Sequence, residues 1–317
     1  MSREGVAVQG AVVQAAADQV AAVHGAADQA DVGTAVTSEV PGSPVPGTPV
    51  PGSQLPASEP PASPLPVERL FLGIDGCRGG WICARWNGAD LLHISRVERL
   101  ADLFPSPPFP VVAIDMPIGL PERAGPGGRE AERLVRPLLG GRQSSVFSVP
   151  SRAAVMAGLQ PGEDEGKRYR AACAAALTSS DPPRAVAKQC FHLFPKMGEV
   201  DALLRERSEL VEQVHECHPE VAFWAMNDGQ PLPLPKKVKN RPHLPGLELR
   251  RSLLASRGIP VDALSAQTAL ALRAGLDDLI DACACAWSAK RVAYGKALRF
   301  PDPPGRDTLG LPICICA

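Results

Sequence analysis

The stretch LFLGIDGCRGGWICARW (residues 70–86) decides the fold. Its first part, LFLGIDG (70–76), is an apolar run that ends in a polar turn, as a buried β-strand does. The glycines of CRGG (77–80) allow the chain to reverse, and WICARW (81–86) supplies a second apolar run. The stretch therefore predicts a β-hairpin with an aspartate, Asp75, inside its first strand.

Three later segments are typical of further strands. LLHISRV (91–97) predicts a third strand, VVAIDMP (111–117) a buried fourth strand, and VEQVHECHPEVAFWAMN (211–227) a fifth. A short helix is expected over VERLADLF (97–104). Apolar residues recur at helical spacing in 128–139, 166–177, 184–207, 247–257 and 277–297. This order predicts an α/β fold: a mixed five-stranded sheet flanked by helices, with a helical insertion between the fourth and fifth strands.

Residues 1–66 differ in composition from the rest of the chain. Ala, Val, Gln and Asp dominate residues 6–37, which contain no aromatic residue to anchor a core, and 41–66 is a repetitive Pro/Gly/Ser tract. Proline at this density blocks both helix and sheet. We therefore interpret 1–66 as a disordered Ala/Pro-rich tail and linker, and 67–317 as the folded domain.

Composition narrows the class of protein. The net charge is −1, but residues 1–66 hold one basic and six acidic residues, so 67–317 carry +4. This small positive charge is compatible with a nucleic-acid substrate, but it is much lower than the positive charge of a dedicated DNA-binding domain. No apolar run approaches the roughly 20 residues that a bilayer requires, so no membrane span is expected. Nine cysteines without a C-x-x-C pair indicate reduced thiols and a cytoplasmic protein.

Aspartates end two of the predicted strands. Asp75 lies in an apolar strand, where an ionised carboxylate without a cation or several donors costs several kcal/mol. Asp115 ends VVAID at the carboxyl edge of a buried strand, where open α/β sheets place their sites. If these strands are adjacent and parallel, both carboxylates point into one crevice. The alternative is that each aspartate caps a turn through backbone N–H groups.

The helix predicted in LDDLIDACACAWSAKR (276–291) adds further acids. Asp278 and Asp281 are three residues apart and share a face. A helix N-terminus also favours acids such as Asp277 and Asp278 as caps. Asp281 lies one turn further in and has no base four residues away on either side, so we expect a cation from elsewhere in the fold to pair with it.

The segment HECHPE (215–220) places two glutamates on the predicted fifth strand. Strand alternation would put Glu216, His218 and Glu220 on one side, and we prefer Glu216 as a fourth carboxylate. His215 and His218 are alternative metal ligands, although a histidine in a strand is more often a structural hydrogen-bonding group. Oxygen-rich surroundings favour Mg²⁺ or Mn²⁺ over zinc.

Six segments, in order, resemble the DUF429 family, whose members are regarded as predicted nucleases of the ribonuclease H-like fold. The resemblance spans roughly residues 70–315. It is carried by GIDGCRGGW (73–81), AIDMPIGLP (113–121), LGGRQSSVFSVPSRAA (139–154), AKQCFHLFPKMGEVD (187–201), HECHPEVAF (215–223) and DDLIDACACAW (277–287). It implies that the sheet is ribonuclease H-like.

The resemblance also implies roles for the acids. Asp75 occupies the first-strand metal-ligand position, and Asp115 the acidic position on the fourth strand. Asp278 and Asp281 are similar to the D-x-x-D pair at the start of the last helix in Holliday-junction-resolvase-like members of the fold. Two features depart from that pattern: residue 115 is Asp rather than Glu, and a long helical insertion separates the fourth and fifth strands.

These inferences predict a nuclease that hydrolyses phosphodiester bonds of DNA or RNA. Two Mg²⁺ or Mn²⁺ ions about 3.5–4 Å apart would be bridged by Asp75, with Asp115 and Asp278 or Asp281 completing their shells. The candidate catalytic residues are Asp75, Asp115, Glu216, Asp278 and Asp281. The candidate phosphate-binding residues are Arg142, Ser144, Ser145 and Lys188. For Arg142 and Lys188, solvation or structural ion pairing is an equal alternative.

Two other function classes stay open. An actin-like or sugar-kinase-like phosphotransferase or ATPase also begins with an aspartate strand and a glycine hairpin, but it needs a second phosphate loop that the sequence lacks. A non-catalytic nucleic-acid- or protein-binding scaffold would use the basic loop that contains Lys236, Lys237, Lys239 and Arg241. The expected partner is a nucleic acid and not a membrane, and a homodimer is allowed.

Overall fold

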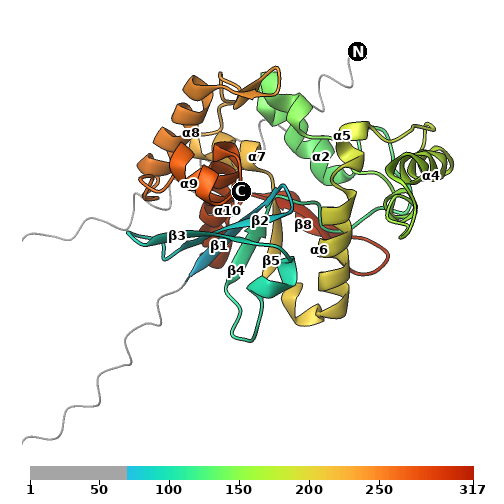
Figure 1. The fold of residues 1–317 in the computed structure, drawn as a ribbon, viewed down its shortest axis with the longest axis horizontal. Helices are drawn as coiled ribbons and strands as arrows, with labels where there is room; N and C mark the ends of the chain where they lie inside the picture. Colours follow the sequence, from blue (N-terminus) through green and yellow to red (C-terminus); the bar gives the residue numbers. More distant parts are fainter. Residues whose placement is uncertain (1–69) are drawn as a thin grey trace, which may run out of the picture.

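The main sheet has seven strands, in the order β3-β2-β1-β4-β5-β9-β8 (Figure 1). The computed structural model describes residues 70–317, so the tail and linker predicted over 1–66 lie outside the described residues. The strands of the main sheet are β1 (Phe71–Cys77), β2 (Gly80–Trp86), β3 (Leu92–Val97), β4 (Val111–Ile114), β5 (Val214–Cys217), β8 (Arg299–Arg306) and β9 (Pro312–Cys316). A separate hairpin consists of β6 (Lys237–Val238) and β7 (Arg241–Pro242).

The sheet is mixed, as the sequence predicts. β1, β2 and β3 form an antiparallel meander, whereas β1 pairs in parallel with β4, β4 with β5, and β5 with β9. The prediction of five strands is wrong, because β8 and β9 extend the sheet beyond β5. Three prolines in RFPDPPGR (299–306) hide β8 from sequence patterns. They are tolerated because β8 is an edge strand. At an edge, the side of the strand that faces solvent needs no N–H donor, so proline can stand there.

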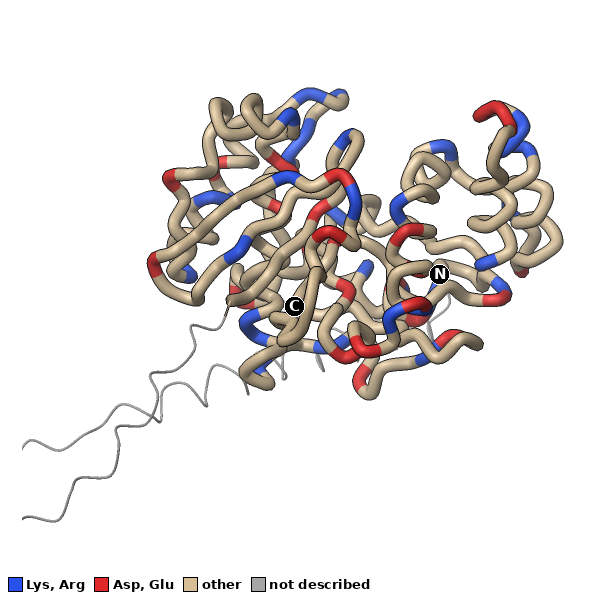
Figure 2. The backbone as a smooth tube through the Cα atoms, turned by 60° about the horizontal axis from the view of Figure 1, so that its bottom comes forward, with Lys and Arg blue, Asp and Glu red and all other residues tan. Residues whose placement is uncertain are grey.

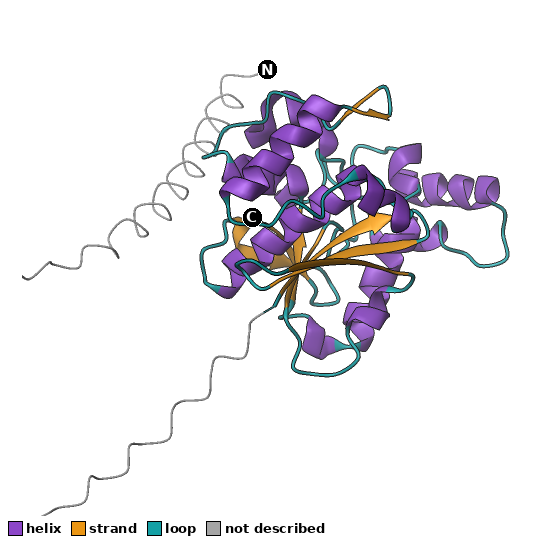
Figure 3. Ribbon diagram, turned by 60° about the vertical axis from the view of Figure 1, so that its left-hand side comes forward, coloured by secondary structure: helices purple, strands orange, loops and turns teal. Residues whose placement is uncertain are grey.

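Helices cover both faces of the sheet (Figure 3). The α-helices are α2 (Glu130–Val135), α3 (Arg152–Ala157), α4 (Glu165–Thr178), α5 (Lys188–Phe191), α6 (Phe194–Glu206), α7 (Pro219–Met226), α8 (Leu244–Ser256), α9 (Ala266–Ala271) and α10 (Leu276–Ala293). Three 3₁₀ helices are η1 (Leu100–Leu103), η2 (Arg136–Ser145) and η3 (Ser208–Leu210). Helices α2 to α6 lie between β4 and β5 in the chain, which confirms the predicted helical insertion.

Alternate residues of β1 face two apolar cores. Leu72 and Ile74 belong to a core shared with the helical insertion, whereas Phe71 belongs to a core shared with α7 and α10. Since side chains alternate along a strand, Gly73 and Asp75 share the face of Phe71. Asp75 therefore points to the α10 side of the sheet.

Gly73 allows α10 to lie directly against β1. A Cβ atom on Gly73 would lie 1.9 Å from the carbonyl oxygen of Ala282 and 2.1 Å from the backbone nitrogen of Ala286. No side chain fits this space, because both contacts are to helix backbone. The glycine two residues before Asp75 thus sets how closely α10, with Asp281, approaches the strand.

The predicted strand over 211–227 is wrong beyond Cys217. β5 ends there, His218 occupies the N-cap position, and Pro219 begins α7. Proline suits the first position of a helix because its φ is already helical and its missing N–H is not needed. The prediction that Glu216 and Glu220 lie on one side of a strand is therefore wrong.

Charged and sulfur-containing residues are dispersed over the fold. Acidic and basic residues are interspersed along the described chain (Figure 2). All nine cysteines are free, and eight of them are buried. Within residues 70–317, no helix combines the length and apolar character needed to cross a bilayer.

Candidate functional site

Two aspartates meet at the carboxyl ends of β1 and β4. These strands pair in parallel, with Ile74 opposite Ile114. The backbone N–H of Asp115 donates a hydrogen bond of 2.8 Å to the carbonyl oxygen of Ile74. The next residue of each strand, Asp75 and Asp115, therefore lies on the α10 side of the sheet, as the sequence predicts for adjacent parallel strands.

The helix α10 adds a third carboxylate. Ligand oxygens of Asp75, Asp115 and Asp281 all lie within 4.8 Å of one another. Asp75 is 7% exposed and Asp281 only 1%. Asp115 is half-buried. Carboxylates this close in such surroundings repel one another when ionised. We call these residues the carboxylate triad.

Burial raises the pKa of each carboxyl in the triad, and repulsion by other members of the triad raises those of Asp75 and Asp281 further. Burial raises the pKa of Asp75 well above its ordinary value, and Asp115 and Asp281 raise it further. Burial also raises the pKa of Asp115, although His218 and Lys236 oppose the shift. The pKa of Asp281 is raised to about 7, again chiefly by burial and against the effect of Lys236. The triad thus favours a bound proton or another cation.

A lysine enters the triad from the basic loop. Lys236 Nζ donates a hydrogen bond to Asp281 Oδ2, and 30% of the lysine side chain is exposed. Burial lowers the pKa of Lys236, but the three aspartates outweigh it and hold that pKa above its ordinary value. Lys236 is therefore a cation of the kind expected beside Asp281, although the sequence pattern indicated only a basic loop that binds nucleic acid or protein.

Lys236 pairs with only one of the two carboxylate oxygens of Asp281. The Oδ1 atom of Asp281 is buried and has no hydrogen-bond partner among the described residues. Leaving a buried acceptor unpaired costs about 1–3 kcal/mol, and more for a charged group. Carboxylate oxygens are the ligands that Mg²⁺ and Mn²⁺ prefer, so the triad and its unpaired oxygen fit a divalent ion.

A cavity of about 270 Å³ opens beside the triad. Its polar lining includes Asp75, Asp115, Ser145, His218, Glu220 and Lys236. A second cavity, of about 260 Å³, shares the wall formed by Phe147 and is otherwise lined mainly by residues of 148–151 and 180–187. The two cavities are concave and partly apolar, as ligand sites usually are.

His218 faces the first cavity beside Asp115. Its Nε2 lies 3.4 Å from the carbonyl oxygen of Ser145, and its Nδ1 is buried without a partner among the described residues. His215 instead lines a different cavity with Arg299, and burial lowers its pKa to about 4. Of the two histidines that the sequence offered, only His218 lies beside the triad.

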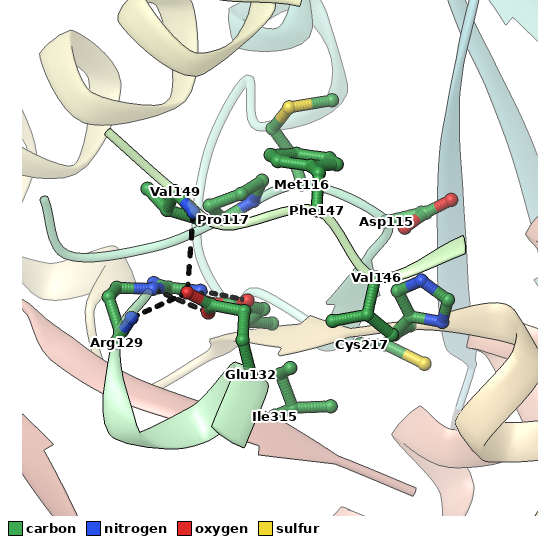
Figure 4. A pocket seen from close by; sticks show the side chains of 12 residues that line it. Asp115, Met116, Pro117, Arg129, Glu132, Val146, Phe147, Val149, Cys217 and Ile315 are labelled. Atoms are coloured by element: carbon green, nitrogen blue, oxygen red, sulfur yellow. Dashed lines mark hydrogen bonds and ion pairs between the residues drawn. The ribbon is translucent and has the colours of Figure 1, made fainter. Parts of the chain in front are cut away.

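The structure does not bring Glu216 into the triad. Glu216 pairs with Ile114 in the register of β4 and β5, so it shares the face of Ile114 rather than that of Asp115. Its Oε1 accepts a hydrogen bond of 2.5 Å from Arg129, which also pairs with Glu132. In Figure 4 the dashed lines join Arg129 and Glu132 to their partners, and none reaches Asp115. Glu216 is thus engaged in an ion-pair network.

Asp278 also lies outside the triad. Its Oδ2 accepts a hydrogen bond of 2.8 Å from the backbone N–H of Gly275, at the start of α10. Its neighbour Asp277 forms an ion pair of 2.6 Å with Lys237. Burial raises the pKa of Asp278, and the Gly275 hydrogen bond opposes this. The helix-cap interpretation therefore describes Asp278, and of the D-x-x-D pair only Asp281 reaches the triad.

The predicted phosphate-binding residues are dispersed. Ser145 lines the first cavity, and its hydroxyl donates a hydrogen bond of 2.8 Å to the carbonyl oxygen of Arg142. Arg142 and Ser144 line neither of the two cavities. Lys188 pairs with Glu165 at 2.7 Å and lies over an aromatic ring of the insertion. Only Ser145 has the placement that contact with a substrate requires.

The raised pKa of Asp281 predicts how stability depends on pH. A carboxyl whose folded pKa is raised to about 7 stabilises the fold fully below its unfolded pKa of about 4, and this contribution is lost as pH rises through about 7. In EDTA, the melting temperature of Asp281→Asn minus that of the wild type should therefore rise between pH 4 and pH 8. Asp262→Asn, which changes an exposed acid, is the control. A difference that falls with pH would contradict the argument.

Comparison with known proteins adds a family but no activity. A family model described as "Protein of unknown function (DUF429)" matches residues 73–306, a span that includes the triad and Lys236. No curated protein and no solved structure shows a significant match. The function has to be inferred from the chemistry of the site itself.

Proposed function

The chain belongs to the DUF429 family, and we propose that it is a Mg²⁺- or Mn²⁺-dependent nuclease that hydrolyses phosphodiester bonds of nucleic acid. One observation carries this proposal. The acids Asp75, Asp115 and Asp281 come from three distant segments and place their oxygens within 4.8 Å of one another. Such a cluster is costly unless cations neutralise it, and it lies at the carboxyl ends of parallel strands, where α/β folds place active sites.

The sheet supports the finer proposal that the domain is ribonuclease H-like. That proposal requires a meander of three antiparallel strands whose first strand pairs in parallel with the fourth, followed by the fifth. The order β3-β2-β1-β4-β5 has this arrangement. The hairpin of β8 and β9 and the helices between β4 and β5 are additions to it.

The residues of the site divide into two groups. Asp75, Asp115 and Asp281 would hold the ion, which when bound supplies a Lewis acid and lowers the pKa of a water that attacks phosphorus. Lys236 and His218 line the same cavity and present nitrogen atoms to a bound phosphate. A phosphate beside the triad would therefore meet positive charge and hydrogen-bond donors as well as acids.

The second cavity supports a polymeric substrate over an isolated phosphate. Phe147 is a wall of both cavities, and Arg184 lies exposed at the lining of the second. An aromatic ring offers a stacking surface to a base, and a guanidinium matches phosphate oxygens. A nucleic-acid strand that places one phosphate at the triad thus has a neighbouring cavity for the adjoining nucleotide.

The test is a panel of single-stranded, duplex, hybrid and junction substrates of DNA and RNA, incubated with Mg²⁺, Mn²⁺ or EDTA. We expect cleavage of at least one substrate class that requires metal and is lost in both Asp75→Asn and Asp115→Asn. Asp90→Asn, an exposed acid of the β2–β3 loop, is the matched control. Cleavage that survives both triad variants would remove the proposal.

Thermal melting separates an enzyme from a non-catalytic scaffold without a substrate. Mn²⁺ should raise the melting temperature of the wild-type protein, because an ion that binds only the folded state stabilises it. This shift should be absent in Asp75→Asn and present in Asp90→Asn. The scaffold alternative predicts no shift in any of the three proteins.

A further inference from the structure

We infer that Lys236 is a resident cation of the carboxylate triad, so that the site without substrate binds one divalent ion rather than two. The inference rests on the proposed metal site and revises the two-ion arrangement expected from the sequence. It depends on two observations. The backbone around Lys236 is held in place, and the charge of the triad after Lys236 matches a single divalent ion.

A buried arginine holds the segment that leads to Lys236. Arg250 on α8 is fully buried and binds both oxygens of Glu220, at 2.6 and 2.8 Å. Its Nη1 donates a hydrogen bond of 3.1 Å to the carbonyl oxygen of Leu234. Movement of Arg250 away from Glu220 would leave two buried charges unpaired and would strongly destabilise the protein, so Arg250 has little freedom to move. It therefore anchors the chain two residues before Lys236.

The start of α8 holds the chain on the other side. The backbone N–H of His243 donates a hydrogen bond of 2.9 Å to the carbonyl oxygen of Lys236. Gly246 lies against the preceding residue so closely that a Cβ atom would be 1.8 Å from the carbonyl oxygen of Pro235. Movement of the backbone at Lys236 would disturb these contacts. The Cα atom of Lys236 is thus held at a fixed place, from which the side chain reaches Asp281.

The next lysine holds the same loop to α10. Lys237 Nζ forms an ion pair of 2.6 Å with Asp277, which precedes Asp281 by one helical turn. Consecutive lysines thus contact consecutive turns of α10. Lys237 is 45% exposed and does not contact the triad, so it provides a matched control for Lys236.

The charge of the site limits the number of ions. The ionised triad carries three negative charges, and Lys236 cancels one of them, which leaves two for a divalent ion. A second divalent ion would leave an excess positive charge in a buried site before any substrate is bound. Lys236 also occupies Oδ2 of Asp281, which leaves Oδ1 as the oxygen of that residue without a partner within residues 70–317. One ion matches both the charge and the available ligand atoms.

The experiment counts Mn²⁺ ions per chain in the full-length protein without substrate, by isothermal titration calorimetry and electron paramagnetic resonance. We expect one ion in the wild type and one in Lys237→Met. Two divalent ions would leave the wild-type site with two excess positive charges, but they would leave Lys236→Met with only one, and this variant also frees Oδ2 of Asp281 as a ligand. We therefore expect Lys236→Met to bind a second ion, while Lys236→Arg keeps the count at one. Asp75→Asn should lose the site in every background.

The outcomes separate this inference from the proposed function. Two Mn²⁺ ions per wild-type chain, both lost in Asp75→Asn, would overturn the inference about Lys236 even if Lys236→Met does not fold. An unchanged number of bound ions in a folded Lys236→Met would also overturn it. One ion in the wild type and two in Lys236→Met would support it even if no nucleic acid is cleaved, and only the nuclease proposal would then fail. Absence of any ion that depends on Asp75 would overturn both.

Discussion

Replacement of Asp75 by asparagine is expected to reduce metal-dependent phosphodiester cleavage by about 10³-fold or more. A catalytic metal contributes several kcal/mol to transition-state stabilisation, and each 1.36 kcal/mol corresponds to about a tenfold change in rate. Asp75 interacts with both other acids of the triad, since each of them raises its pKa. The measurement is the single-turnover rate of Asp75→Asn on the best substrate of the panel.

The same variant should fold well, because asparagine has the shape of aspartate and removes one buried like charge from the triad. Its melting temperature in EDTA should therefore equal or exceed that of the wild type at pH 8. This second measurement distinguishes loss of the metal ligand from loss of structure. A rate within tenfold of the wild type in a folded variant would refute the assignment of Asp75.

Replacement of Arg129 by methionine is expected to destabilise the protein by about 3–5 kcal/mol, the usual result of removing one partner from a buried ion pair. The Arg129 side chain is 1% exposed and pairs with Glu132 at 2.7 Å and Glu216 at 2.5 Å. It also donates a hydrogen bond of 2.6 Å to the carbonyl oxygen of Ile118. Its loss would leave two buried carboxylates without their cation. Urea unfolding at pH 7 provides the measurement.

Two further variants test this explanation. Arg99→Met removes an arginine from an exposed pair with Asp102 and should leave the urea midpoint nearly unchanged. Glu216→Gln placed in the Arg129→Met background should recover part of the lost stability, because it removes one of the unpaired charges. Additive effects of the two substitutions would show that Glu216 and Arg129 do not act as the pair described above.

Local sequence was sufficient to predict the elements that carry the triad. The hairpin with Asp75 in its first strand, the strand before Asp115 and the helix with Asp281 all occur where apolar periodicity and glycines indicated them. The convergence of Asp75 and Asp115 could also be predicted, because residues at the carboxyl ends of two adjacent parallel strands lie side by side at the same edge of the sheet.

Errors arose where a local pattern had more than one solution. VHECHPEVAF has strand character throughout, yet Pro219 begins a helix, so Glu216 and Glu220 belong to different elements. Prolines in 299–306 indicate a loop, but the edge of the sheet accommodates them as β8. In both cases tertiary context, not intrinsic preference, decided the element.

By itself the sequence determined the order of the elements from β1 to β4, the faces of those two strands, and the presence of acids that needed a cation, because these depend on residues close together in the chain. Only the tertiary structure decided which cation each acid meets. Lys236 and Asp281 are 45 residues apart, and Arg129 and Glu216 are 87 apart. Pairing over such separations follows from how the loops and helices pack, and no pattern within a single segment records it.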